Sequence, residues 1–320
     1  MTQVHTASRG WTDKLRWLFA PPLPVTLAVC ALVLFARRPE SWLNPQFWAE
    51  DAYFYERAYA IGRDAFRLPY AGYLHLIPRI VAAMSVLLDP LWAPAFFAAC
   101  SAALTLYVAA RTQSGRCPIP RVAVSALAVV LVPDAFEVLH NIVNIQWVLA
   151  GGLVLLLLAA DPESWSEYAH DFAAAVLLGL TGPFSIMLAP LFLWRAAVRR
   201  TRASVALAVV VTLCGAVQAW QIWRDAAVAP EAAHVASAIL AVPGMRIVAS
   251  LVAGYLVPRD FSRPVEIALG VFMVAGLAAL AGYRGPARAE RGRLAMAIVI
   301  FLGGSLFRCR HLLPDLTRAG

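Results

Sequence analysis

The sequence predicts an all-α, polytopic integral membrane protein. Of its 320 residues, 61% are hydrophobic and only 14% are charged, whereas a soluble domain has about 45–50% apolar and about 25% charged residues. Apolar stretches of about 20 residues, the length of a membrane-crossing helix, recur along the chain. Short segments rich in Pro, Gly and Arg separate them. We therefore expect a single transmembrane domain over residues 1–320, with the lipid bilayer as its solvent.

The positive charge lies in the segments that connect these apolar stretches. The net charge is +8 from 27 basic residues, and Lys14 is the only lysine among them. Arginines in short loops between spans are topology signals and contacts for lipid head groups, so nucleic acid is not an expected partner. The arginine-rich coding suggests a high-GC bacterium, and the expected location is the bacterial cytoplasmic membrane.

Charge asymmetry sets the predicted topology, because cytoplasmic loops carry an excess of arginine and lysine. The basic tail 1–17 and the segment Arg111–Arg121, with three arginines and no acid, should lie in the cytoplasm. The polar segment 37–73 between them then lies outside. Only one full crossing fits between that segment and Arg111, so we interpret 74–88 as an interfacial or re-entrant helix on the outer side.

The remaining segments complete a bundle of about nine crossings with shorter re-entrant pieces. Thr181-Gly182-Pro183 breaks one apolar stretch into two halves, and this break should face outward because four arginines follow it. The polar segment Asp161–Asp171 is interpreted as an inner turn. The predicted apolar segments are Leu18–Ala36, Leu91–Ala110, Val122–Val132, Ile145–Ala160, Phe172–Leu180, Phe184–Trp194, Ala203–Ile222, Glu231–Leu256, Val265–Gly282 and Leu294–Phe307.

In this topology the unusual polar residues gather at the outer face. An adjacent carboxylate pair, Glu50 and Asp51, follows the first span among aromatic residues. Such a pair suits a general base, which must lie within hydrogen-bond reach of the hydroxyl it deprotonates. A solvated charge pair or a helix N-cap is the structural alternative. The other candidate binding residues are Tyr70, Tyr73, His75, Arg79, His140, Asn141, Asn144, Arg308 and Arg310.

The motifs that contain these residues have both a functional and a structural interpretation. Aromatic rings stack on sugars and an arginine holds a phosphate bidentately, although a tyrosine belt with a snorkelling arginine fits Tyr70–Arg79 as well. Polar side chains entering a span often line a cavity, yet Asn144 and Gln146 also suit inter-helix hydrogen bonds. The break at Thr181 offers a helix N-terminus for an anion, or is a proline kink. The cysteine spacing indicates neither a disulfide nor a zinc site.

These motifs resemble the bacterial membrane glycosyltransferases of the GT-C fold class. The resemblance rests on residues 47–51, 69–79, 141–147 and 181–184, within roughly the first 185 residues. It implies an enzyme that takes a sugar from a polyprenyl-phosphate carrier and attaches it to an envelope glycan or lipid outside the membrane. By that resemblance Asp51, or Glu50, is the base, and Arg79, Arg308 and Arg310 bind the carrier phosphate. The chain stops where members of the class usually continue, so a short or truncated member is expected.

The resemblance implies no certain cofactor; a divalent cation is compatible with the proposed chemistry and not required by it. Two other functions stay open at this point. A transporter or flippase of a lipid-linked or anionic solute would use broken helices and buried polar residues as a pathway. A non-catalytic envelope membrane protein is the third. The clustering of titratable groups at one face favours the enzyme.

Overall fold

The computed structural model describes residues 21–48, 50–118, 123–132 and 137–225. The chain forms two compact units, residues 1–221 and 222–320, and the described residues belong to the first apart from the last turn of its final helix. The basic tail 1–17, the three apolar segments beyond Glu231, and the candidates Arg308 and Arg310 lie outside the described residues.

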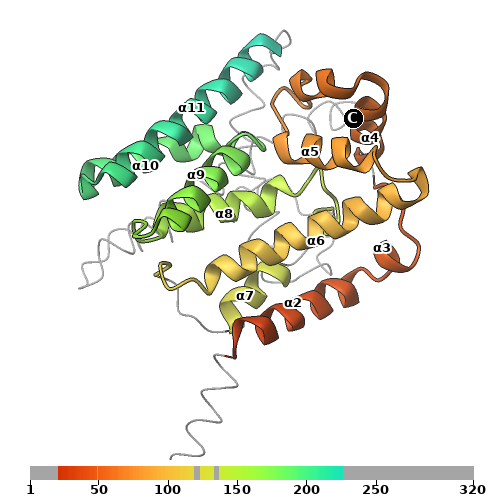
Figure 1. Ribbon diagram of the computed structural model, residues 1–320, viewed down its shortest axis with the longest axis horizontal. Helices are drawn as coiled ribbons and strands as arrows, with labels where there is room; N and C mark the ends of the chain where they lie inside the picture. The colour runs from red at the N-terminus through yellow and green to blue at the C-terminus, as the bar shows by residue number, and fades with distance from the viewer. Residues whose placement is uncertain (1–20, 49, 119–122, 133–136, 226–320) are drawn as a thin grey trace, which may run out of the picture. The chain divides into compact units, whose positions relative to one another are not determined.

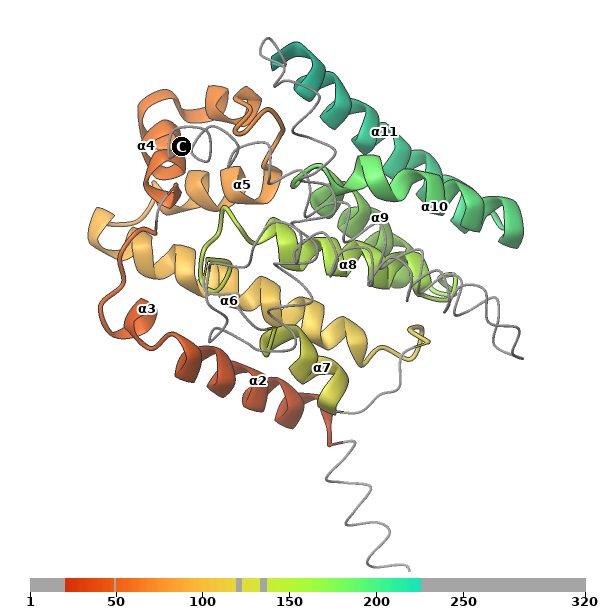
Figure 2. The ribbon, with the colours of Figure 1, turned by 180° about the vertical axis from the view of Figure 1, so that it is seen from behind.

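The described part of the chain is helical and contains no strand, which confirms the predicted all-α class. The chain colours of Figure 1 follow these helices in order, and Figure 2 shows them from behind. The elements are α2 (Leu23–Arg37), α3 (Glu40–Leu43), α4 (Asp51–Ile61), η1 (Gly62–Arg67), α5 (Leu76–Ser85), η2 (Pro90–Trp92), α6 (Ala93–Thr112), α7 (Ala123–Val130), α8 (Gln146–Leu158), α9 (Trp165–Gly179), α10 (Phe184–Arg199) and α11 (Arg202–Asp225), where η marks a 3₁₀ helix.

The segment 37–73 folds into α3, α4 and η1, although the sequence predicted a polar loop there. In α4, Asp51, Phe54 and Ala58 are buried, and their spacing of three and four residues gives the helix one inward face. The helix ends at Gly62, whose φ of +56° favours glycine. The inward face carries only three residues, so its periodicity is too short to stand out in a polar sequence.

Helix α9 begins at Trp165 and not at the predicted Phe172. Ser164 and Glu167 form a capping box: the Ser164 hydroxyl accepts from the Glu167 N–H, and the Glu167 carboxylate accepts from the Ser164 N–H. The first two turns are polar because they lie at the end of the bundle. The inner turn predicted at Asp161–Asp171 is therefore wrong in its second half.

Successive long helices alternate in direction, and α6 lies between α2, to which it is antiparallel, and α8, to which it is parallel (Figures 1 and 2). Helices α4 and α5 cover one end, which we call the α4 end; there Arg38 stacks over Trp48 and Leu76 N–H bonds to Leu180 O. At the opposite end, which we call the Asp161 end, α8, α10 and α11 meet at Asp161. The predicted outward break of Thr181-Gly182-Pro183 thus lies at the same end as Glu50 and Asp51.

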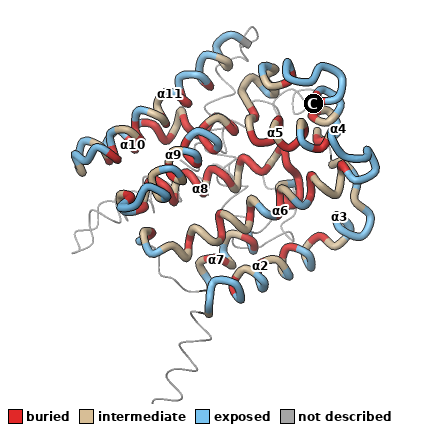
Figure 3. The backbone as a smooth tube through the Cα atoms, viewed as in Figure 1, coloured by how far each residue is buried: buried red, intermediate tan, exposed pale blue. Residues whose placement is uncertain are grey.

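Buried residues follow the inward faces of the helices (Figure 3). Two helices of the described chain are long and apolar enough to cross a membrane, Pro90–Thr112 and Arg202–Arg224. Leu23–Arg37, Leu76–Ser85 and Gln146–Leu158 are apolar but shorter. The number of about nine crossings stays a prediction.

Candidate functional site

Asp51, the first residue of α4, is a buried carboxyl group. Only 2% of the residue is exposed, and its Oδ1 accepts a hydrogen bond of 3.2 Å from the Val143 N–H. Neither it nor Glu50 caps α4 through its side chain. Burial, partly opposed by the Val143 hydrogen bond, raises the pKa of Asp51 to about 7. A carboxylate with that pKa can take and release a proton near neutral pH.

The loop between α7 and α8 holds the hydrogen-bond donor of Asp51 in place. Asn141 Oδ1 accepts from the Val143 N–H at 2.9 Å and from the Asn144 N–H at 3.0 Å, so Asp51 and Asn141 share one donor. The Ser101 hydroxyl of α6 donates to Asn141 O at 3.3 Å. The Asn144 side chain donates to Glu137 O. Asn141 and Asn144 therefore brace the loop that supplies the donor to Asp51, through side-chain bonds within the loop and not between helices.

Glu50 is half-buried beside Asp51 and reaches Tyr70. Burial and the neighbouring Glu50 carboxylate, which bonds to the hydroxyl, raise the pKa of Tyr70 to about 12. The hydroxyl therefore stays protonated and donates to Glu50. The two carboxylates point to different surroundings, since Asp51 meets the α7–α8 loop and Glu50 meets Tyr70.

Tyr70 and Tyr73 close a tight turn over α5. The backbone N–H of Tyr70 donates to Tyr73 O at 3.0 Å, and the N–H of Tyr73 donates to Tyr70 O at 3.2 Å. The residues between them have positive φ, +53° at Ala71 and +83° at Gly72. The Tyr73 ring stacks on His75 with centroids 4.6 Å apart, and the Tyr70 ring meets the same imidazole edge-on at 5.6 Å. The turn therefore forms an aromatic cover over His75.

His75 is 1% exposed. Its Nδ1 lies 3.2 Å from Tyr73 O, and because a carbonyl only accepts, Nδ1 carries the proton and donates. Burial lowers the pKa of His75 to about 3, so the ring is neutral and Nε2 carries a lone pair. Among the described residues that lone pair has no donor.

Arg79, one helical turn after His75, is a buried guanidinium with 2% exposure. Its Cζ lies 4.1 Å above the Phe54 ring, and Nη2 donates to Leu68 O at 3.2 Å. Burial lowers the pKa of Arg79, and the Tyr53 hydroxyl, a hydrogen-bond partner of the guanidinium, partly opposes this shift. In the described part of the chain Nε and Nη1 lack an acceptor, and no carboxylate pairs with them. A buried cation in this state attracts an anion.

The break between α9 and α10 is joined to the start of α5. Ile77 N–H donates to the Thr181 hydroxyl at 3.0 Å, and Gly182 N–H donates to Leu74 O at 3.1 Å. Gln218 of α11 accepts from Leu74 N–H at 2.8 Å and donates to Leu74 O at 3.1 Å and Gly182 O at 3.0 Å. Sequence reasoning missed Gln218, and the available signal was an amide side chain inside an apolar helix.

Gln146, at the start of α8, links this break to the tyrosine turn. Its Nε2 donates to the Tyr73 hydroxyl at 3.2 Å, while its Oε1 has no donor among the described residues. Trp147 beside it meets Phe184 edge-on at 5.2 Å. The structure thus brings together the motifs at 50–51, 70–79, 141–147 and 181–184.

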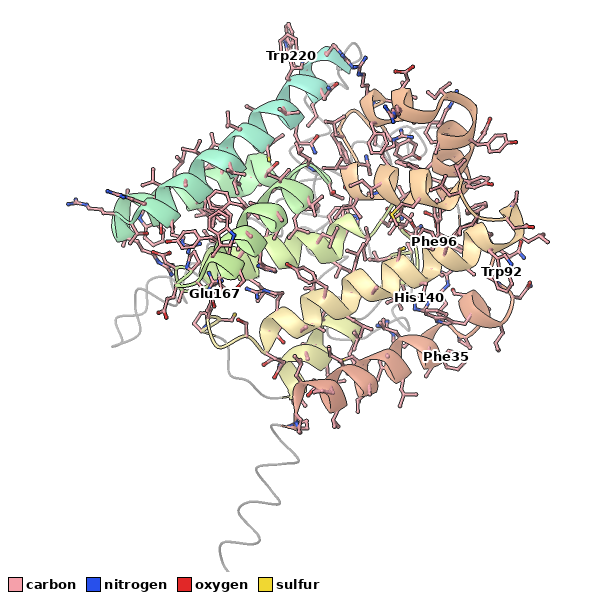
Figure 4. All side chains as sticks on the ribbon, in the orientation of Figure 1. Phe35, Trp92, Phe96, His140, Glu167 and Trp220 are labelled. Carbon is pink, nitrogen blue, oxygen red and sulfur yellow. The ribbon has the colours of Figure 1, made fainter. Side chains whose placement is uncertain are left out.

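His140 belongs to the α7–α8 loop and packs against α3 (Figure 4). It packs edge-on against Trp42 with centroids 5.1 Å apart, at a backbone φ of +57°. Burial, and then the neighbouring Arg38, lowers its pKa to about 4. Arg38 also donates to Leu139 O at 2.7 Å. His140 therefore packs near Arg38 and away from Tyr70 and Arg79.

The Asp161 end holds ion pairs that the sequence did not predict as pairs. Asp161 accepts from Arg195 at 2.7 Å, Arg199 at 2.9 Å and Ser204 at 3.0 Å, and also from Thr201. Burial by itself would raise the pKa of Asp161, but these hydrogen bonds together hold that pKa below its usual range. These bonds tie α8, α10 and α11 together, although the buried Nε of Arg195 has no acceptor among the described residues.

A second pair at that end joins Arg116 to Asp171 through two hydrogen bonds. His170 links Asp171 to the Tyr107 hydroxyl. The sequence places these acids beside arginines of one predicted side, which was a usable signal. Within 21–48, 50–118, 123–132 and 137–225, no group of three or more His, Cys, Asp or Glu side chains could hold a metal ion.

Comparison with known proteins adds no relative: no family model, no curated protein and no solved structure matches this chain.

Proposed function

We propose that this protein is a membrane glycosyltransferase that moves a sugar from a polyprenyl-phosphate carrier to an acceptor hydroxyl outside the cytoplasmic membrane, with Asp51 as the base. The observation that carries the proposal is the α4 end itself. There a buried carboxyl group with a pKa of about 7 belongs to the same compact end as Arg79, a buried guanidinium with two unused donor nitrogens. A base for a hydroxyl and a cation for a phosphate are the two groups this transfer requires.

Exposed apolar surface supports a bilayer around the helices. Val205, Val209, Leu213 and Val217 are exposed at a spacing of four residues along α11, which forms a continuous apolar stripe. Leu32 of α2 is 67% exposed. Water would oppose such a stripe, whereas lipid tails match it.

Exposed tryptophans occur at both ends of these helices. Trp92 and Trp220 lie at the α4 end (Figure 4), and Trp165 and Trp194 lie at the Asp161 end. Tryptophan is enriched at the two membrane–water interfaces. The helix Pro90–Thr112 has 23 residues and so spans about 34 Å, close to the thickness of the hydrocarbon core. Both features favour a membrane-crossing orientation of α6 and α11.

The proposed reaction is a single displacement. Asp51 accepts the proton of the acceptor hydroxyl as the hydroxyl oxygen attacks the anomeric carbon. The bond from that carbon to the phosphate oxygen breaks, and its electron pair leaves with the polyprenyl phosphate. Arg79 stabilises the negative charge that develops there. The anomeric configuration inverts because only one displacement occurs.

The distribution of charge favours an enzyme over a transporter. In α2, α6, α8 and α11, acidic, basic and histidine side chains occur only in the first or last turns, and the central turns of these helices hold none. A transport pathway needs ionisable groups near the bilayer midplane. The groups seen here suit chemistry at one membrane boundary.

The test is sugar transfer by membranes that contain the full chain, supplied with radiolabelled polyprenyl-phosphate hexoses and an envelope glycan acceptor. Asp51→Asn should lower the rate of transfer by about 100-fold or more, the usual contribution of a positioned base. The wild-type rate should rise with pH up to about 7 as Asp51 ionises. Asp64→Asn changes an exposed carboxylate of η1 and should leave the rate unchanged.

Unaltered transfer by Asp51→Asn would remove Asp51 from the role of base. If wild-type vesicles moved the intact lipid-linked sugar between leaflets without transferring it, the protein would be a flippase.

A further inference from the structure

Several buried side chains at the α4 end have polar atoms that the described fold does not use, and three of these side chains lie around the Tyr70–Tyr73 turn. They are the neutral Nε2 of His75, the Nε and Nη1 of Arg79, and the Oε1 of Gln146. The exposures of these residues are 1%, 2% and 4%. Leaving a buried donor or acceptor unsatisfied is unfavourable, so several together call for a partner.

These side chains belong to one connected group. His75 and Arg79 are one turn apart on α5, and Phe54 touches both, with its centroid 5.5 Å from the His75 ring and 4.1 Å from the Arg79 Cζ. Tyr73 stacks on His75, and its hydroxyl accepts from Gln146. The three unsatisfied groups therefore surround the Tyr70–Tyr73 turn.

The hydrogen-bonding character of the group defines the ligand. Arg79 offers charged donors, which bind a phosphate oxygen. His75 Nε2 and Gln146 Oε1 are acceptors, and an acceptor requires an O–H or N–H from the ligand. Phosphate diesters without hydroxyl groups satisfy only the arginine. A phosphate ester with neighbouring hydroxyls satisfies all three residues, and the tyrosine rings suit the apolar face of a sugar.

We propose that His75 and Gln146 read the hydroxyl groups of the donor sugar, each accepting one hydrogen bond, while Arg79 holds the phosphate that carries the sugar. The inference rests on the proposed function and adds to it the residues that distinguish a glycosylated carrier from the bare carrier. The Tyr70–Tyr73 turn covers this subsite, so the turn must move for the donor to enter. Its two positive-φ residues, Ala71 and Gly72, mark the point that changes.

The experiment measures equilibrium binding to the purified full chain in detergent, without an acceptor, so no turnover is needed. The probes are a short-chain polyprenyl phosphate, the same carrier bearing a hexose, and free hexose 1-phosphate. The wild type should bind the glycosylated carrier at least tenfold more tightly than the bare carrier. Gln146→Met and His75→Asn should each reduce that ratio by about tenfold, with little change in the affinity for the bare carrier.

The variants are chosen to keep the fold. Met matches the length of Gln146 and removes its acceptor, while Asn at position 75 places an amide donor where Nδ1 donates to Tyr73 O and omits the Nε2 acceptor. Gln113→Met makes the same change at the Asp161 end and should leave the ratio unaltered. Thermal unfolding of each variant reports whether it is folded.

An unchanged ratio in folded Gln146→Met and His75→Asn overturns the inference and means that the unused atoms bind internal water only. Equal wild-type affinity for the two carriers, or no affinity for either, also overturns it. Equal affinity for free hexose 1-phosphate and the lipid-linked sugar assigns the subsite to soluble sugar phosphates, which contradicts a carrier-linked donor. The transfer assay with Asp51→Asn fails or succeeds separately, because binding does not require the base.

Discussion

At the scale of single residues, Asp51 connects the stability of the fold to its chemistry. Its carboxyl group has an ordinary pKa near 3.8 and a pKa of about 7 in the folded protein. The folded state therefore binds the proton more tightly than the unfolded state. The free energy of unfolding must fall as pH rises from about 4 to about 7, because ionisation is unfavourable in the buried site.

Asp51→Asn should remove this pH dependence. The amide oxygen of the substituted side chain can still accept from the Val143 N–H, and the amide never ionises. Well above pH 7 we expect the variant to be more stable than the wild type by up to about 4 kcal/mol, with no difference near pH 4. Thermal unfolding between pH 4 and 8 measures this, with Asp64→Asn as the exposed control. Equal pH slopes for wild type and Asp51→Asn would show that the carboxyl group ionises normally.

Sequence reasoning reached Asp51 through its neighbours and not through its burial. An acidic pair in a polar segment looks solvated, and Glu50 indeed remains half-buried beside Tyr70. Burial of Asp51 follows from its register on α4 with Phe54 and Ala58. The sequence also could not predict that Gln146 Oε1 lacks a donor, since hydrogen-bond satisfaction depends on which groups the fold brings near.

At the scale of elements, the break between α9 and α10 depends on Gly182. Its φ is +92°, and an added Cβ would lie 2.5 Å from Gln146 Oε1 and 3.2 Å from the Phe184 ring. Gly72 has a similar φ of +83° but open space around it. A comparison of the two glycines therefore distinguishes the cost of a side chain at positive φ from the cost of its overlap with Gln146.

Gly182→Ala should therefore destabilise the protein more than Gly72→Ala. We expect about 1 kcal/mol for Gly72→Ala from the left-handed backbone alone, and about 2–4 kcal/mol for Gly182→Ala, which adds the overlap with Gln146. Chemical unfolding of both variants in detergent gives the two values. Equal losses of stability in the two variants would mean that Gln146 moves away from the added Cβ at no energetic cost.

At the scale of the whole molecule, the antiparallel order of the helices collects two different sets of polar groups at opposite ends. The α4 end has buried groups with unused hydrogen-bonding atoms, as at His75 and Arg79. The Asp161 end has acids whose hydrogen bonds come from arginines and hydroxyls of the fold, as at Asp161 and Asp171. The proposed ligand chemistry uses the first end, and the described ion pairs of Asp161 and Asp171 lie at the second.

The proposed orientation places these ends on opposite sides of the membrane. Glu56 on α4 and Glu163 before α9 are both exposed, one at each end. A membrane-impermeant maleimide applied to spheroplasts should label Glu56→Cys and should label Glu163→Cys only after permeabilisation. The wild type, with its native cysteines, gives the background. The reverse pattern would put Asp51 in the cytoplasm and remove the basis for an extracytoplasmic reaction.

The sequence by itself determined the helical class, the order of the apolar segments and the end at which the motifs at 50–51, 70–79 and 181–184 gather. Composition and the alternation of apolar stretches with basic turns are local properties, and antiparallel order follows from short connections. Only the tertiary structure decided which groups are used up and which are left open. Gln218 and Asp161 are saturated by partners distant in sequence, whereas Arg79 and Gln146 are not. Hydrogen-bond satisfaction is a property of the assembled neighbours, and no segment carries it alone.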